Sequence, residues 1–173
     1  MEKISMYNAT VPNFVRTLSN LKNILVKAEA WVKEKKIDET TLLGARLALD
    51  QFSFVKQVQV ASDNAKGTAA RLIGVEPPIF EDSEQTIAAL RERLEKTIAY
   101  LQTLKAEQFE GSEERQVTLK YFPGKYILGL DYVNGYGLPN FYFHVVSAYS
   151  ILRHYGLSIG KADYIGELPF KDL

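Results

Sequence analysis

Residues 8–36, NATVPNFVRTLSNLKNILVKAEAWVKEKK, carry the pattern that decides the fold. Apolar side chains recur in this stretch at steps of three and four residues, which places them along one face of a helix. The face consists of Val11, Phe14, Val15, Leu18, Leu21, Leu25, Ala28 and Val32. We expect Thr10 to cap this helix and Pro12 to lie in its first turn, where the missing N–H of proline is harmless.

Three further segments repeat the helical spacing. We expect helices over residues 40–73, 83–104 and 130–155. Gly74 is a natural C-cap for the second of the four helices, and Asp82 or Ser83 is a good N-cap for the third. Pro139 lies inside the fourth, so we expect a kink or a late start near Leu138.

The period changes between the third and fourth predicted helices. Residues 117–121 alternate, residues 126–128 are apolar and β-prone, and residues 122–125 between them are turn formers. This pattern predicts a short β-hairpin. Four long amphipathic helices with so few strand residues indicate an all-α protein, a four-helix bundle formed as a single domain by residues 1–173.

The composition excludes several classes of protein. The 21 Lys and Arg residues balance 21 Asp and Glu residues, so the chain lacks the basic excess of most nucleic-acid-binding proteins. There is no cysteine and there are only two histidines, which excludes disulfides and metal sites built on thiolates or on three histidines of one chain. No apolar run has the length of a membrane span or resembles a secretion signal, so we expect a cytoplasmic protein without membrane or nucleic-acid partners.

The fourth predicted helix carries polar residues on a mainly apolar background. Asn140, His144 and Ser147 recur at steps of four and three, so they share a face. Buried polar groups need partners, and two explanations stay open. Either this face lines a ligand site, with the hydroxyl of Tyr136 as a further donor, or His144 is a core histidine bonded to a carbonyl or carboxylate of the second helix.

The second predicted helix has a polar face of its own. Asp50, Gln57 and Asn64 follow one another at spacings of seven, and the apolar neighbours of Asp50 in residues 47–52 predict that it is partly buried. An Asp50–His144 pair across two helices would orient the imidazole for general-base catalysis, or would serve equally as a structural hydrogen bond. The candidate catalytic residues are therefore His144 and Asp50, and the candidate ligand-binding residues are Asn140, Gln57, Tyr136 and Ser147.

The two histidines do not form a metal site with each other. His144 and His154 are ten residues apart, so their backbones lie about 15 Å apart along one helix, whereas metal–nitrogen bonds are about 2 Å long. His144 and Asp50 together supply at most two ligands, fewer than the three protein ligands of a catalytic zinc site. We therefore predict a protein without a bound metal or other cofactor.

Seven segments, taken in order, resemble one protein family. They are MYNATVPNF (6–14), ARLALD (45–50), QVQVASDN (57–64), GVEPP (74–78), LPNFYFH (138–144), ILRHYG (151–156) and GKADY (160–164). In combination they resemble DUF1993, a family of domains of unknown function in the DinB/YfiT-like superfamily, over nearly the whole chain. The resemblance implies a DinB-like four-helix bundle that is often dimeric.

Members of the wider superfamily include metal-dependent enzymes, among them thiol S-transferases and maleylpyruvate isomerase-like proteins. The resemblance implies a metal held by three histidines, one from the second helix and two from a later His-x-x-x-His step. Here His144 is similar in position to the first of that pair. Ala148, which cannot ligate, stands where the second would be, and the nearest candidate on the second helix is Asp50.

Three hypotheses for the function follow. The first is a DinB-like bundle that has lost the three-histidine metal site and binds a small organic molecule near Asp50, Asn140 and His144, with or without acid–base isomerase or transferase activity. The second is a non-catalytic helical homodimer or interaction protein, and a dimer would use the small residues from Ala61 to Ala70 as a close helix contact. The third is a metal-dependent transferase with an atypical site. Whether the chain is an enzyme stays open at this point.

Overall fold

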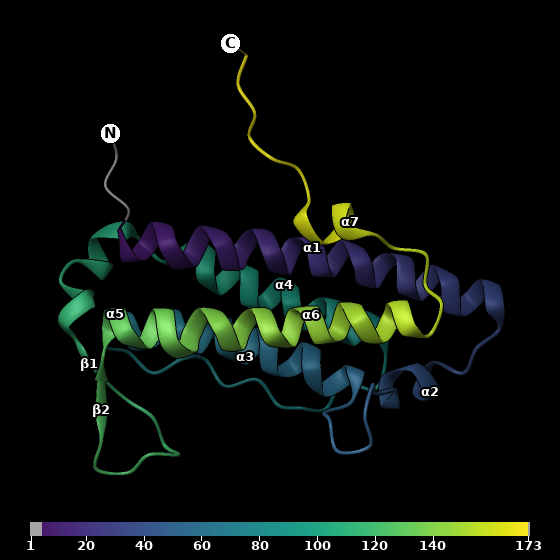
Figure 1. The fold of residues 1–173 in the computed structure, drawn as a ribbon, viewed down its shortest axis with the longest axis horizontal. Helices are drawn as coiled ribbons and strands as arrows, with labels where there is room; N and C mark the ends of the chain where they lie inside the picture. The colour runs from purple at the N-terminus through teal and green to yellow at the C-terminus, as the bar shows by residue number, and fades with distance from the viewer. Residues whose placement is uncertain (1–4, 173) are drawn as a thin grey trace.

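The computed structural model describes residues 5–172 and consists mainly of helices that lie side by side (Figure 1). Four of them are long: α1 (Met6–Lys35), α3 (Phe54–Ile73), α4 (Ile87–Thr103) and α6 (Leu138–His154). α1 packs against α4, while α3 packs against both α4 and α6. The prediction of an all-α bundle with a hairpin before its last long helix is confirmed. No helix within residues 5–172 is long and apolar enough to cross a membrane.

α1 begins earlier than predicted, and Thr10 is not its N-cap. The side chain of Ser5 caps the helix by accepting a hydrogen bond from the N–H of Asn8 at 3.1 Å. Thr10 is buried within the helix, where its hydroxyl donates to a backbone carbonyl one turn earlier. Pro12 therefore lies beyond the first turn. Its missing N–H leaves the carbonyl of Asn8 free, and the side-chain amide of Asn13 donates to that carbonyl at 3.4 Å.

The prediction of one helix over residues 40–73 is wrong for residues 45–53. A short helix, α2 (Glu39–Gly44), is followed by an irregular loop over residues 45–53, and α3 begins only at Phe54. The loop is closed by a hydrogen bond from the N–H of Phe54 to the carbonyl of Ala45 at 2.7 Å. The predicted end is confirmed, because Gly74 caps α3 in the left-handed conformation with a φ of 73°.

α4 begins four residues later than predicted. Thr86, and not Asp82 or Ser83, is its N-cap and accepts a hydrogen bond from a backbone N–H one turn into the helix. The carboxylate of Asp82 is instead engaged in ion pairs with Lys56 of α3 and Arg93 of α4. The acidic side chain at the predicted start of the helix therefore has a tertiary role in place of a capping role.

The predicted hairpin is present and projects from one end of the bundle (Figure 1). Its strands, β1 (Gln116–Thr118) and β2 (Tyr126–Leu128), are antiparallel. The register pairs Gln116 with Leu128, Val117 with Ile127 and Thr118 with Tyr126. Two turns of 3₁₀ helix, η1 (Ala106–Phe109) and η2 (Ser112–Glu114), connect α4 to the hairpin.

The last long helix contains a π turn. The single-turn helix α5 (Gly129–Tyr132) is followed by the π turn η3 (Val133–Gly137), where the N–H of Leu138 donates to the carbonyl of Val133 five residues earlier. α6 continues from Leu138 with Pro139 in its first turn, so helical backbone runs from Gly129 to His154 and the irregularity expected near Leu138 is a π turn in place of a late start. Such turns inside α-helices are rare, and they occur frequently at functional sites.

The C-terminal tail crosses back over the first helix. It includes a short helix, α7 (Lys161–Ile165), that packs against α1. Lys27 of α1 forms an ion pair with Asp163 at 2.5 Å, and the side-chain amide of Asn20 donates to two backbone carbonyls of α7. These contacts hold the short helix of the tail against α1.

The small residues of α3 pack against neighbouring helices of the same chain. Ala61, Ala65, Ala69 and Ala70 are all fully buried in one chain. They allow the neighbouring helices to approach α3 closely. A dimer contact through this run of small residues, as predicted, would require surface that the chain itself already covers.

Candidate functional site

His144 of α6 and Gln57 of α3 form the centre of the candidate site. The Nδ1 atom of His144 lies 2.7 Å from the Oε1 atom of Gln57, a buried side-chain hydrogen bond between the two helices. The side-chain nitrogen of Gln57 donates in turn to the carbonyl of Phe52, in the loop before α3, at 3.1 Å. In a continuous helix the carbonyl of Phe52 would accept a hydrogen bond from the backbone N–H four residues later. The side chain of Gln57 therefore links the loop to the last helix.

These two hydrogen bonds fix the tautomer of the imidazole. Because the amide nitrogen of Gln57 donates to Phe52, the amide oxygen faces His144, and an amide oxygen only accepts hydrogen bonds. The Nδ1 atom of His144 must therefore carry a hydrogen. Burial lowers the pKa of His144 below its ordinary value, so the ring is neutral at pH 7 and Nε2 has a free lone pair.

The side chain of His144 is buried, with 6% exposed, and its Nε2 atom is the part that Gln57 does not occupy. This nitrogen forms no hydrogen bond within residues 5–172, and it is not one of the fully buried polar atoms that lack a partner in that range. Phe52 stacks on the imidazole with 6.2 Å between ring centroids, and Phe143 meets it edge-on at 5.2 Å. Both phenyl rings are about half exposed, at 51% and 56%. A neutral acceptor thus lies beside two accessible aromatic rings.

Three of the predicted ligand-binding residues lie on the same helix as His144 at different distances from it. Asn140, which is half-buried, and Ser147, which is buried, lie about one turn before and one turn after His144 on the same helix face. Tyr136 lies eight residues before His144, about 12 Å along the helix, and lines a cavity beside the hairpin. The structure therefore brings Asn140 and Ser147 near the imidazole and places Tyr136 in a separate region.

Asp50 has a different position from the predicted one. It lies in the exposed loop over residues 45–53 and not on a helix, so the expected partial burial is wrong. Its carboxylate forms no hydrogen bond or ion pair in the part of the chain that the structure describes, and the contact predicted between Asp50 and His144 is made by Gln57. The buried hydrogen-bond partner of His144 is an amide in place of a carboxylate.

Three further polar residues between α3 and the last helix were missed by sequence reasoning. The buried hydroxyl of Tyr132 lies 3.3 Å from the hydroxyl of Thr68 and accepts a hydrogen bond from Nη1 of Arg71 at 3.2 Å. We define the polar seam as Gln57 and Asn64 of α3 together with Asn140 and His144 of the last helix. The spacing offered a signal, because Asn64, Thr68 and Arg71 continue the face of Gln57 at steps of seven, four and three.

Comparisons with known proteins agree with this fold. The family model described as "Domain of unknown function (DUF1993)" matches residues 6–165. The chain belongs to the DUF1993 family. A solved structure of a DinB family member protein from Shewanella denitrificans is 41% identical to this DUF1993 protein, with a TM-score of 0.93, and the match covers 97% of this chain and 96% of that chain. No curated protein matches the chain.

The donor atoms of this DUF1993 protein do not fit the three-histidine metal site that the DinB-like resemblance implies. His144 directs its Nδ1–H at Gln57, and Ala148, one turn later, is buried and has no donor atom. Residues 5–172 contain no group of three His, Cys, Asp or Glu side chains that could hold a metal ion. One imidazole nitrogen and one amide oxygen are fewer ligands than a catalytic zinc requires.

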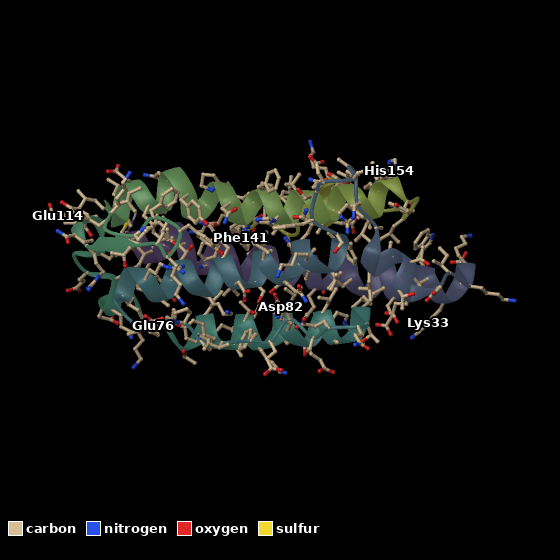
Figure 2. The ribbon with its side chains drawn as sticks, turned by 90° about the horizontal axis from the view of Figure 1, so that it is seen from below. Lys33, Glu76, Asp82, Glu114, Phe141 and His154 are labelled. Atoms are coloured by element: carbon tan, nitrogen blue, oxygen red, sulfur yellow. The ribbon has the colours of Figure 1, made fainter. Side chains whose placement is uncertain are left out.

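The opposite side of α3 in this DUF1993 protein carries a charged cluster around Arg93 of α4. The guanidinium is buried, with 1% of the side chain exposed, and it contacts the carboxylates of Asp63, Asp82 and Glu84 at 2.7, 3.0 and 2.9 Å. Burial alone would lower the pKa of Arg93, but its hydrogen bonds to Glu84 and Asp63 raise it, so the group stays charged. Figure 2 shows Asp82 between α3 and α4, and Phe141 on the α6 side.

Proposed function

We propose that this DinB-like protein has lost the three-histidine metal site and binds a small organic molecule at the polar seam, where the Nε2 atom of His144 accepts a hydrogen bond or a proton from it. The observation that carries the proposal is the hydrogen bond between Gln57 and His144, because it leaves a neutral imidazole whose Nε2 acceptor is used by no described residue. The rings of Phe52 and Phe143 beside that acceptor suit a flat, largely apolar ligand with a hydroxyl group.

The same geometry supports acid–base chemistry that needs no metal. Burial lowers the pKa of His144, so the imidazole is unprotonated at neutral pH and can take up a proton at Nε2. Gln57 is a positioning residue, because it holds the ring in the Nδ1–H tautomer. Asn140 and Ser147 lie on the same helix face and are the nearest further polar groups for a ligand. An isomerase or transferase reaction would use His144 as its base.

Phenol and anisole test this proposal, because both have an aromatic ring and only phenol has a hydroxyl donor. Long-range ¹H–¹⁵N NMR spectra resolve the two nitrogens of each histidine. We expect the Nδ1–H tautomer for His144 in the free protein, and a saturable shift of its Nε2 signal with phenol. We expect anisole to bind about fivefold more weakly, since one neutral hydrogen bond contributes about 1 kcal/mol.

Two substitutions provide the controls for this experiment. His144→Phe keeps an aromatic ring and removes the acceptor, so it should abolish the preference for phenol over anisole. His154→Gln changes the only other histidine, which is exposed at the far end of α6, and should leave the preference unchanged. A proton on Nε2 in the free protein, or equal binding of phenol and anisole, would overturn the proposal.

A homodimer is the second candidate, and one observation favours it. The loop before α3 and the outer face of α6 expose several large apolar side chains, of which Phe52 and Phe143 contact His144: Leu47, Leu49, Phe52, Phe143 and Val146. Leu49 is 95% exposed, and apolar surface of this kind marks interfaces more often than free surface. A second copy seated on this face would cover His144, so the two candidate functions exclude each other at one surface.

Light scattering at tens of micromolar separates these two candidates. A dimer that dissociates in Leu49→Asp and in Phe143→Asp, but not in Val26→Asp, would favour the interaction protein. Val26 is an exposed apolar residue of α1 and serves as the matched control. A monomer that binds phenol would favour the ligand-binding protein.

A further inference from the structure

The hairpin end of the bundle has a cavity whose lining is mainly cationic. This cavity of about 610 Å³ lies between the hairpin and the segment that follows α3. Its cationic lining residues are Arg71, Arg115, Lys120 and Lys125. Glu76 is the only acidic residue of the lining, and Figure 2 shows it at this end of the molecule, far from His154. The whole chain has a formal net charge of zero, so this positive excess is local.

None of these four cations has a carboxylate partner among residues 5–172. The ion pairs in that range are all formed by other lysines and arginines. Arg71 is held in place by the neutral hydroxyl of Tyr132. Four cations that share one cavity with a single carboxylate repel one another and raise the local potential. A ligand with a negative charge would relieve that repulsion.

Two glycines leave room for the two guanidinium groups. A Cβ atom at Gly67 would lie 2.6 Å from Nη1 of Arg71, and a Cβ atom at Gly74 would lie 2.7 Å from Nη1 of Arg115. Gly74 also has a positive φ, which accounts for glycine there. Gly67 lies in the middle of α3, where glycine destabilises a helix by about 1 kcal/mol relative to alanine. A side chain at this position would displace the end of the Arg71 side chain from where it lies in the structure.

An apolar cavity adjoins the cationic one. It has a volume of about 330 Å³, and Leu119, Phe122, Ile127 and Tyr136 are among its lining residues. Lys125 lines both cavities, so the cationic and apolar parts meet at its side chain. Both volumes are in the range of sites that bind small molecules.

We propose that the hairpin end binds a small organic anion. Its phosphate or carboxylate group lies at Arg71, Arg115 and Lys125, and its apolar part lies against Phe122 and Tyr136. Guanidinium groups suit this role because their paired N–H donors match two oxygens of a phosphate or carboxylate. The site is independent of the one proposed at His144, since about 12 Å of helix separates Tyr136 from His144.

Phenyl phosphate is the probe for this site, and isothermal titration calorimetry is the measurement. We expect saturable binding that weakens as salt is raised, because salt screens exposed charges. The double variant Arg115→Gln/Lys125→Gln should bind at least about tenfold more weakly, since it removes two charged donors. Both side chains are exposed and have no hydrogen bond within the described residues, so the fold should be unaffected.

A matched control and two further ligands complete the experiment. Lys96→Gln/Lys161→Gln removes the same charge from exposed positions outside both cavities and should change the affinity less than twofold. His144→Phe should bind phenyl phosphate as the parent does. Benzoate should bind more weakly to Arg115→Gln/Lys125→Gln than to the parent, whereas any binding of benzyl alcohol should be the same in both, which separates the anionic group from the ring.

Three results would overturn the proposal. The first is no binding of either phenyl phosphate or benzoate. The second is an equal loss of affinity in the two double variants, which would indicate only the overall charge. The third is inorganic phosphate bound as tightly as phenyl phosphate, which would show that the apolar cavity takes no part.

Discussion

The two sides of α3 use polar residues in opposite ways. Toward α4, Arg93 contacts three carboxylates, and Lys56 and Lys66 pair with two of the same carboxylates, so three cations balance three anions. Toward α6, the polar seam is made mainly of neutral groups, and several of them keep free hydrogen-bonding capacity. The Nε2 atom of His144 accepts from no described residue, and the buried Oδ1 atom of Asn64 has no partner.

This difference separates a structural role from a binding role on one helix. A buried charge is tolerated only when partners compensate for its lost hydration, and the Arg93 cluster supplies those partners completely. The cluster thereby fixes the segment between α3 and α4, including Asp82 and Glu84, and retains no free group for a ligand. The Nε2 atom of His144 and the Oδ1 atom of Asn64 lie on the other side of α3, and the cations without ion pairs lie at the hairpin, which is where we place the ligands.

Replacement of Arg93 should have the largest effect on stability. Arg93→Met leaves the carboxylates of Asp63, Asp82 and Glu84 facing one another without their cation, and we expect a loss of about 3 kcal/mol in the free energy of unfolding. Arg71→Met is the matched change on the α6 side and should cost about 1 kcal/mol, because it removes one hydrogen bond to a neutral hydroxyl. Urea denaturation measures both, and equal losses would contradict the distinction between the two sides.

A carboxylate placed beside His144 should change its titration. In Gln57→Glu an anion replaces the neutral amide that faces Nδ1, which favours the imidazolium and should raise the pKa of His144 by about one to three units. NMR titration of the ring signals measures the change, with the exposed His154 as an internal reference. An unchanged titration of His144 would show that Gln57 does not contact the ring in solution.

The lowered pKa of His144 also predicts how stability depends on pH. The unfolded chain takes up a proton at this histidine near its ordinary pKa of about 6.5, whereas the folded chain does so only at lower pH. Stability is therefore complete above pH 6.5 and decreases as pH falls below it, by up to about 1.4 kcal/mol at pH 5.5. The midpoints of urea denaturation at pH 7.5 and 5.5 should differ more in the parent than in His144→Phe. An equal difference in the two proteins would show that His144 is not the source of the pH dependence.

The smallest effect on stability is expected at Gly67. Gly67→Ala should improve helix propensity by about 1 kcal/mol and displace the side chain of Arg71, so the net change should stay within about 1 kcal/mol. The affinity for phenyl phosphate should nevertheless fall severalfold. Gly44→Ala, at a helical glycine with open space around it, should leave that affinity unchanged. Unchanged affinity in Gly67→Ala would show that this glycine does not position Arg71.

The parts of the fold that the sequence predicted are those with a strong helical period. The stripes of α1 and α4 and the turn residues of the hairpin act locally, so neighbouring residues suffice to identify them. The loop over residues 45–53 is different, because Leu47 continues a helical apolar pattern and yet lies exposed. That loop is held by Gln57, which also bonds to His144 at a distance of 87 residues in the chain, and no local pattern contains such a contact.

The sequence predicted which helix faces form the candidate site, but it did not predict which residue contacts His144. Periodicity placed His144 and Gln57 on the polar faces of their helices, but it did not fix how those faces align, so Asp50 was chosen where Gln57 is found. The cations at the hairpin were missed altogether. Arg71 and Arg115 come from a helix end and from the residue next to a strand, and only the folded chain brings them to one cavity.

The π turn over residues 133–137 has a consequence for how this protein can diversify. One α-helical residue corresponds to a rotation of about 100°, and a π turn holds one residue more than an α turn. Loss of one codon, at Gly135 for example, would restore a continuous α-helix and turn α5 and the hairpin about the axis of α6 while His144 kept its orientation. Gly135 is exposed, and a Cβ atom there would meet no other atom within 4 Å, so the position itself is not packed against the bundle. Insertions and deletions at this point would therefore remodel the hairpin cavity between related proteins and leave the environment of His144 intact.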